Sequence, residues 1–258
     1  MTPFIPREII TQLSLGFKIF PLYGNVLNQC SCKKSDCSSP AKHPIIFNSF
    51  RSATNNLQTI SYWLKRFPFC NFAVATGRPS NIVVLDIDLR KDGHQSIKDI
   101  TIPLTYTVLT GNGYHYYFKL PRKYHNLRSF NGILQGVDFK ANNAYVVCPP
   151  STHINGRQYE IHTESDFAEI PSKILDLILE KKNAENKIYE GKRNSELFRI
   201  GLGIAHNKIK DKSRLLKYLQ ITNLDRCSPP LKPSEVKLIR NNILKIINGK
   251  ELKGSLNI

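Results

Sequence analysis

The run Asn81-Ile-Val-Val-Leu-Asp-Ile-Asp88 constrains the fold of this chain more than any other segment. Its branched aliphatic residues favour a buried β-strand. Because side chains two positions apart in a strand point to the same face, Asp86 and Asp88 leave one face together. Adjacent carboxylates repel each other, and a hard divalent cation is the usual remedy. The competing interpretation is an acidic pair that caps a loop and faces solvent.

The charge of the chain indicates the kind of partner it meets. Its 258 residues carry a formal net charge of +17, which favours nucleic acid or an anionic membrane surface. No apolar run approaches the roughly 18 residues that span a bilayer, and the N-terminus lacks the features of a signal peptide. We therefore expect a cytoplasmic protein that binds nucleic acid and not membranes.

The first 165 residues or so alternate short apolar runs with Gly, Pro and Asn turns. Short connections between the later runs predict an α+β fold with a mostly antiparallel sheet. The expected strands are Phe17–Leu22, Phe72–Thr76, Ile82–Asp88, Thr105–Thr110, Tyr114–Leu120, Ala144–Cys148 and Gln158–His162. The expected helices are Pro6–Gly16, Ile60–Phe67 and a short one near His94–Ile100.

The pattern becomes helical after Pro171. Three further helices are predicted, at Asn194–Asn207, Lys212–Thr222 and Pro233–Asn248. From Glu185 onward, 16 Lys and Arg face 7 Asp and Glu, a net charge of +9. We therefore expect a catalytic domain over residues 1–168, a helix and linker over 169–187, and a basic all-α domain over 188–258.

Asp138 is the best candidate for a third carboxylate ligand. It lies in Gly136-Val-Asp-Phe-Lys140, which predicts another strand end. A pair of divalent cations held by Asp86, Asp88 and Asp138 suits nucleotidyl transfer, in which one ion activates a 3′-hydroxyl and the other neutralises a triphosphate.

The segment Thr110-Gly-Asn-Gly-Tyr-His-Tyr-Tyr-Phe118 predicts a strand–turn–strand whose glycines admit a bound group. Gly113 and His115 are therefore candidates for nucleotide binding, with Lys140 adding a charge-assisted hydrogen bond. His153, after the stiff turn Cys148-Pro-Pro-Ser-Thr, is a further candidate. A plain hairpin with a satisfied histidine, and a turn residue at His153, are the alternatives.

Three cysteines and one histidine cluster within fourteen residues. Cys30, Cys32, Cys37 and His43 match the ligand set of a tetrahedral Cys₃His zinc site. Nearby Lys33, Lys34 and Lys42 make this loop basic and suited to contact nucleic acid. The alternative is a loop with free thiols. The other cysteines, Cys70, Cys148 and Cys227, are expected to be small buried hydrophobic residues.

Aromatic and basic residues alternate after the hairpin. They suit stacking along a single strand, although core packing is the more common role of such rings. The aromatic residues are Tyr114, Tyr116, Tyr117, Tyr124 and Phe130, among Arg122, Lys123 and Arg128.

Together these segments resemble, in order, the bifunctional primase–polymerase domain of the archaeo-eukaryotic primase superfamily. The resemblance covers Pro6 to His162 and includes Thr76-Gly77 and the Gly156 and Tyr159 that follow His153. It implies a recognition-motif-like sheet that is mixed or antiparallel. It also implies that Asp86, Asp88 and Asp138 hold Mg²⁺ or Mn²⁺ and that His115 contacts the nucleotide phosphates. The chain departs from the family at Asn142-Asn143-Ala144, where glycines are usual, and at Gly113, where related primases often carry serine.

The helical tail resembles the small helical domain found after primase cores. The matching pieces are Gly191-Lys-Arg-Asn-Ser-Glu-Leu-Phe198 and Asn223-x-x-x-Arg226-Cys-x-Pro-Pro-Leu231. The resemblance implies that Arg193, Asn194 and Arg226 contact template or nucleotide. The alternative is a solvated basic bundle.

The resulting hypothesis is a DNA primase and polymerase that makes primers de novo on single-stranded DNA from nucleoside triphosphates and extends them. Two alternatives remain: a non-catalytic replication initiator that binds DNA, and a metal-dependent nuclease. The sequence carries no helicase phosphate-binding loop, so we expect any unwinding to come from a separate helicase.

Overall fold

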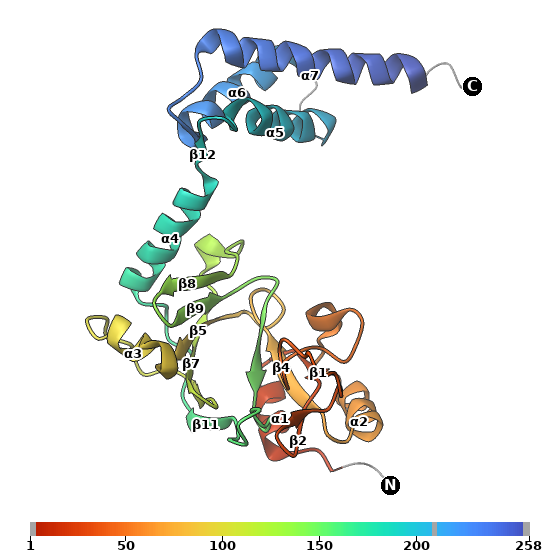
Figure 1. Cartoon of the computed structure of the whole chain (residues 1–258), viewed down its shortest axis with the longest axis vertical. Coiled ribbons are helices and arrows are strands. Elements are labelled where there is room, and N and C mark those ends of the chain that lie inside the picture. Colours follow the sequence, from red (N-terminus) through yellow and green to blue (C-terminus); the bar gives the residue numbers. More distant parts are fainter. Residues whose placement is uncertain (1–3, 208–210, 255–258) are drawn as a thin grey trace. The chain divides into compact units, whose positions relative to one another are not determined.

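The computed structural model of the chain (Figure 1) describes residues 4–207 and 211–254. The chain divides into two compact units, residues 1–178 and 179–258. We describe each unit by itself.

The larger sheet of the first unit has six strands in the order β11-β6-β7-β5-β9-β8, and all its strand pairs are antiparallel. This arrangement confirms the expected α+β class. The strands are β5 (Ile82–Asp88), β6 (Thr107–Leu109), β7 (Gly113–Lys119), β8 (Phe130–Leu134), β9 (Val137–Lys140) and β11 (Glu160–Thr163).

A second sheet of three antiparallel strands, in the order β1-β4-β10, packs on the first. One apolar cluster joins residues of both sheets, among them Val84 and Tyr117 from the larger sheet and Val74 from the smaller. Helices α1 and α2 add Ile9 and Ile60 to this cluster and lie beside the smaller sheet (Figure 1). The elements are α1 (Arg7–Ser14), α2 (Leu57–Arg66), β1 (Ile19–Leu22), β4 (Asn71–Ala75) and β10 (Tyr145–Cys148).

The functional end of the sheet follows from the alternation along β5. Ile82 and Val84 face the other sheet and belong to the shared core. Asp86 and Asp88 follow on the same face, because strand side chains repeat every two residues. The apolar part of the strand thus anchors the two carboxylates where the core ends.

The remaining elements of the first unit are short. Strands β2 (Asn25–Val26) and β3 (Gln29–Cys30) form a hairpin at the start of the cysteine-rich loop. Helix α3 spans only Gly93–Ser96, which is shorter than expected. Three 3₁₀ turns complete the set: η1 (Ser49–Ser52), η2 (Leu89–Lys91) and η3 (Arg122–Tyr124).

The second unit is helical, as expected. Its core joins the helices through buried side chains such as Leu197, Leu219 and Ile243. A short parallel pair, β12 (Ile188–Tyr189) and β13 (Cys227–Ser228), accompanies them. The helices are α5 (Arg193–Asn207), α6 (Lys212–Arg226) and α7 (Pro233–Gly254), and α4 (Ser172–Asn186) crosses the boundary between the units. Within the described ranges, no helix is long and apolar enough to cross a membrane.

Candidate active site

The centre of the site is a row of three side chains on adjacent strands. Asp86 of β5 lies directly opposite His115 of β7 and Asp138 of β9. Directly paired residues of antiparallel strands project to the same face. The sheet register thus places one imidazole and two carboxylates side by side, and Asp88 lies two residues further along β5 on the same face.

Each of the three carboxylates has a basic side chain as a neighbour. Asp138 also accepts a hydrogen bond of 2.7 Å from the Gly132 backbone N–H. Pairs of this kind orient the carboxylate oxygens. The pairs are Asp86 Oδ1 with His115 Nε2 at 3.5 Å, Asp88 Oδ2 with Arg90 at 3.1 Å, and Asp138 Oδ2 with Lys140 Nζ at 2.8 Å.

The electrostatic balance favours ionised aspartates. Burial raises the pKa of Asp86, but the charges of His115, Lys140 and Lys42 outweigh it, so that the pKa lies below its ordinary value. For Asp88, burial again raises the pKa, but hydrogen bonds from Arg90 outweigh this effect, so that the pKa lies below its ordinary value. Both side chains therefore present negative oxygens to the cleft at neutral pH.

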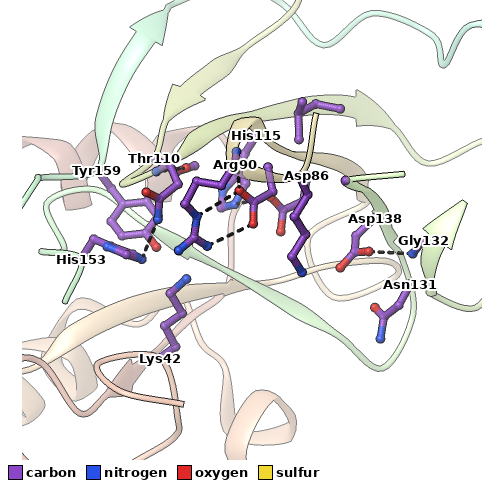
Figure 2. Close-up of a pocket in the computed structure, with 15 residues that line it drawn as sticks. Lys42, Asp86, Arg90, Thr110, His115, Asn131, Gly132, Asp138, His153 and Tyr159 are labelled. Atoms are coloured by element: carbon purple, nitrogen blue, oxygen red, sulfur yellow. Dashed lines mark hydrogen bonds and ion pairs between the residues drawn. The ribbon is translucent and has the colours of Figure 1, made fainter. Parts of the chain in front are cut away.

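These side chains line one pocket, which we call the catalytic cleft (Figure 2). His153 and Tyr159 lie at one end of it, and Asn131, Gly132 and Asp138 lie at the other. His153 therefore lies in the cleft. Burial lowers its pKa, and a side-chain interaction with Asn155 opposes this effect. Two other predicted residues lie at the margin, since Gly113 pairs with Asp88 and Lys140 reaches the cleft through Asp138.

Lys42 is a cleft residue whose place there was not predicted. The sequence assigned it to the basic loop, whereas the structure places it in the cleft, across from Arg90 and Asp86 (Figure 2). Desolvation lowers the pKa of Lys42 below its ordinary value, and the neighbouring charge of Asp86 opposes this effect only in part. The sequence shows that Lys42 precedes His43, but no local sequence pattern indicates the direction in which a loop side chain points.

The Cys/His cluster forms as predicted. Atoms that can ligate a metal on Cys30, Cys32, Cys37 and His43 all lie within 4.8 Å of one another. Burial lowers the pKa of His43, which favours the neutral imidazole that binds metals. A backbone hydrogen bond at Lys34 lowers the pKa of Cys32, whereas burial raises that of Cys37. The set is consistent with a structural zinc site.

The β2–β3 hairpin sets the position of the first cysteine of the cluster, Cys30. Leu27 and Asn28 at its tip have φ of 51° and 61°, as a two-residue type I′ turn requires. Gly24 and Ser31 then close the base, because the Ser31 N–H donates to the Gly24 carbonyl and the Gly24 N–H donates to Ser31 Oγ. The hydrogen bonds of the hairpin therefore fix the position of Cys30 at the start of the cysteine-rich loop.

The segment Ala41–His43 links the cluster to the cleft. The Ala41 N–H donates to Cys30 Sγ, and His43 Nε2 lies 3.4 Å from the same sulfur. Between them, the Lys42 carbonyl accepts a hydrogen bond from the Tyr145 hydroxyl at 3.1 Å. Ligation at the cluster and the position of Lys42 thus depend on the same three residues.

The carboxylates are spread more widely than the Cys/His ligands. In the part of the chain that the structure describes, the Cys/His set is the one group of three or more candidate ligands whose atoms are mutually within 4.8 Å. A carboxylate site for two ions must span metals about 3.5–4 Å apart, so a wider set is expected. About a third of the side-chain surface of Asp86 and of Asp138 is exposed, which leaves oxygens open to a hard cation.

Other predicted contact residues lie elsewhere. Lys33 and Lys34 are exposed on the cysteine loop. In the second unit, Arg193 donates to the Pro229 carbonyl, Arg226 donates to the Asn186 carbonyl, and Asn194 lies 3.5 Å from Glu235. Their role in binding template or nucleotide stays a prediction.

Two of the aromatic residues proposed for stacking are part of the core. Tyr117 is fully buried between the sheets, and Phe130 is 4% exposed. Tyr117 stacks on Phe17 with ring centroids 5.6 Å apart. For these rings the core-packing alternative is correct.

Comparison with known proteins identifies the first unit. The family of bifunctional DNA primase/polymerase N-terminal domains matches residues 10–173, which include every residue of the cleft and of the Cys/His cluster. No curated protein matches the chain. The family implies primase/polymerase activity, with DNA and nucleoside triphosphates as substrates. This chain belongs to the bifunctional DNA primase/polymerase family.

Proposed function

We propose that the chain synthesises primers de novo on single-stranded DNA by two-metal nucleotidyl transfer and then extends them. The observation that carries this proposal is the register that aligns Asp138, Asp86 and His115 in one row at the edge of the core. A row of this kind offers oxygen ligands and a nitrogen donor to the same bound group.

In this proposal, Asp86, Asp88 and Asp138 hold Mg²⁺ or Mn²⁺. The fit rests on their donor chemistry, since three carboxylates from two neighbouring strands line one cleft. When bound there, the ions supply charge neutralisation at the triphosphate and activate the attacking 3′-hydroxyl. The 3′-oxygen bonds to the α-phosphorus, and pyrophosphate leaves with the electrons of the broken bond.

The cations of the cleft orient the triphosphate. His115 is the donor assigned from the sequence, and its Nε2 faces the cleft beside Asp86. Lys42 adds a charge from the opposite wall, and Arg90, whose side chain is 63% exposed, adds another. Such groups can contact phosphate oxygens with charge-assisted hydrogen bonds. Lys140, held by Asp138 and Asn131, fixes the carboxylate in place.

The Cys/His cluster, in turn, holds structural Zn²⁺. We assign zinc from the soft ligand set and the compact arrangement of its four ligand atoms. The exposed Lys33 and Lys34 of this loop contact the nucleic acid.

The proposal extends to the second unit and to the setting of the reaction. The helical domain assists primer initiation through Arg193, Asn194 and Arg226. A separate helicase supplies the unwound template, and the protein works in the cytoplasm.

One assay tests the function. The purified full chain is incubated with single-stranded template, Mg²⁺ or Mn²⁺ and labelled nucleotides, without a primer. We expect new labelled oligonucleotides whose synthesis depends on the metal. Binding without synthesis would instead indicate a DNA-binding initiator, and shortening of the template would indicate a nuclease.

A further inference from the structure

A second concave surface of the first unit is rich in arginine and contains no acid. We call it the basic pocket. No Asp or Glu occurs among the described residues that line it, in contrast to the catalytic cleft. Its lining residues are Lys18, Phe50, Arg51, Ala53, Arg78, Pro79, Asn126, Arg128, Asn142 and Asn143.

Asn142, one of the residues that departs from the family pattern, builds this pocket. Its side-chain amide donates to the His125 carbonyl at 2.8 Å and to the Leu127 carbonyl at 2.6 Å. Its Oδ1 accepts a hydrogen bond from the Arg78 N–H at 3.0 Å. The Asn142 side chain thus connects its own segment with two others that line the pocket, one around Arg78 and one over residues 125–127.

Gly77 allows this close approach. It has a φ of +78°, and a Cβ atom on it would lie 2.5 Å from Asn142 Oδ1 and 2.7 Å from Asn142 Cα. Only glycine fits both the backbone conformation and the space. In the Thr76-Gly77 pair, the glycine therefore lets Asn142 approach closely enough to accept the hydrogen bond from the Arg78 N–H.

The arginine side chains are preorganised by their neighbours. The Arg78 guanidinium donates to the His125 carbonyl at 3.4 Å and to Asn126 Oδ1. Arg51 lies over the Phe50 ring at 5.8 Å, and Arg128 lies over the Phe130 ring. Contacts with carbonyls and rings of this kind restrict the positions that a guanidinium can adopt. The three arginines are also exposed to solvent.

Two neighbouring segments lead from the catalytic cleft to this pocket. One carries Asn131 in the cleft and Arg128 in the pocket, and the other carries Asp138 in the cleft and Asn142 in the pocket. Four residues of extended chain span at most about 13 Å. About four stacked nucleotides, at roughly 3.4 Å each, cover the same length.

We propose that the basic pocket binds the phosphate backbone of the single strand that enters the catalytic cleft. The inference rests on the proposed function and adds to it a site for the strand outside the reaction centre. Cations from four separate chain segments suit a row of phosphates better than one small anion, because they are distributed over the pocket. The amides of Asn126 and Asn143 add neutral hydrogen-bonding groups beside the charges.

The first test compares two double variants of equal charge. Arg51→Ala with Arg78→Ala removes two pocket arginines. Arg7→Ala with Arg66→Ala removes two exposed arginines that lie outside both the cleft and the pocket. Arg66 is a matched control for Arg51, because it also lies 5.8 Å from a phenylalanine ring.

Affinity for a single-stranded oligonucleotide is measured by fluorescence anisotropy at several salt concentrations, without nucleotides or divalent metal. Loss of two phosphate contacts is expected to weaken binding about tenfold near 0.1 M salt and to reduce the slope of log K against log salt by about 1.4. The control variant should bind like the wild type. Equal losses in both variants, or none in either, would overturn the proposal.

Cross-linking provides a readout that does not depend on the variants folding. A wild-type complex with an iododeoxyuridine-containing oligonucleotide is irradiated and digested. Cross-linked peptides are expected to contain residues 47–54, 76–80 or 125–143. Cross-links confined to other segments would contradict the assignment.

Competition with inorganic phosphate identifies the source of the phosphate groups. If inorganic phosphate displaces the oligonucleotide from the wild type at equal phosphate concentration, the pocket is a site for free anions and the proposal fails. Primer synthesis is measured separately. A chain that makes no primers but needs Arg51 and Arg78 for strand binding would refute the proposed function and leave this inference intact.

Discussion

The catalytic cleft and the Cys/His cluster are joined by the three residues Ala41–His43, yet they hold their side chains in different ways. In the cleft, Asp86 and Asp138 project from hydrogen-bonded strands whose apolar parts form the core. In the cluster, the ligands after Cys30 lie on a loop outside the helices and strands. Lys33 of this loop has a left-handed backbone conformation, with a φ of 60°. A left-handed residue with a long side chain is unfavourable without tertiary support.

This difference indicates what each metal would do. The sheet positions the carboxylates by itself, so we expect metal ions to be able to enter and leave the cleft with each nucleotide. Beyond the β2–β3 hairpin the loop is not part of a sheet, so we expect it to need a metal to stay folded. Because Lys42 lies between Ala41 and His43, we expect the structural site to control one cation of the catalytic site.

The largest effect is expected from Asp86→Asn. This substitution keeps the size of the side chain but removes the charge at the centre of the row. Nucleotide incorporation should fall about a thousandfold, which corresponds to roughly 4 kcal/mol of transition-state stabilisation. Asp99→Asn is the matched control, because Asp99 is exposed and does not line the cleft.

Binding of single-stranded DNA and the far-ultraviolet circular dichroism of the Asp86 variant should match the wild type. Full incorporation by Asp86→Asn would exclude this carboxylate as a metal ligand. The same measurement on Asp88→Asn and Asp138→Asn tests the rest of the triad.

Loss of the Cys/His cluster should have the next largest effect. Cys32→Ser removes one of four ligands, and zinc release is measured with a colorimetric chelator. We expect the variant to hold less zinc, to unfold at a lower temperature, and to bind nucleotide about ten to a hundred times more weakly. Cys70→Ser, which changes a cysteine outside the cluster, should keep its zinc and its nucleotide affinity.

Lys42→Ala is expected to have a smaller effect of the same kind. Removing one charge-assisted contact with the triphosphate should raise the nucleotide KM about tenfold, while zinc content stays unchanged. Lys34→Ala is the control, because Lys34 lies on the same loop but not in the cleft. If Lys34→Ala raises KM equally, the loop acts through its overall charge and not through the placement of Lys42.

Combining Lys42→Ala with Cys32→Ser sharpens the comparison. If the cluster acts on nucleotide binding through Lys42, the double variant should resemble Cys32→Ser alone, because coupled residues are not additive. Simple addition of the two effects would show that the cluster and Lys42 act independently.

Local periodicity predicted much of the fold but not the relation between strands. Alternation along β5 was enough to place Asp86 and Asp88 on one face. The alignment of Asp86 with His115 and Asp138 depends on sheet order and register, which are set by contacts far apart in the sequence. Strand periodicity picked out the residues one by one, and only their chemistry and the family resemblance implied that they meet at one site.

Strand β8 shows the limits of the periodicity argument. Phe130-Asn-Gly-Ile-Leu134 was not predicted as a strand. Its polar Asn131 and its glycine depart from strand preferences, and Gly132 has a φ of +58° where the register with β9 shifts. That irregularity also directs the Gly132 N–H at Asp138, so a weak strand signal coincides with a contact in the site.

The smallest effect concerns thiol reactivity, and it separates the cluster cysteines from the others. Burial raises the pKa of Cys70 to about 12, so at pH 8 only about one thiol in 10⁴ is the reactive thiolate. Burial also raises the pKa of Cys148 and Cys227. Iodoacetamide with mass spectrometry should therefore modify none of the six cysteines in the zinc-bound chain, three after chelation, and all six after denaturation. Modification of Cys70 along with the cluster would mean that zinc removal also opens the core. The folding of the sheet would then depend on zinc as much as the folding of the loop does.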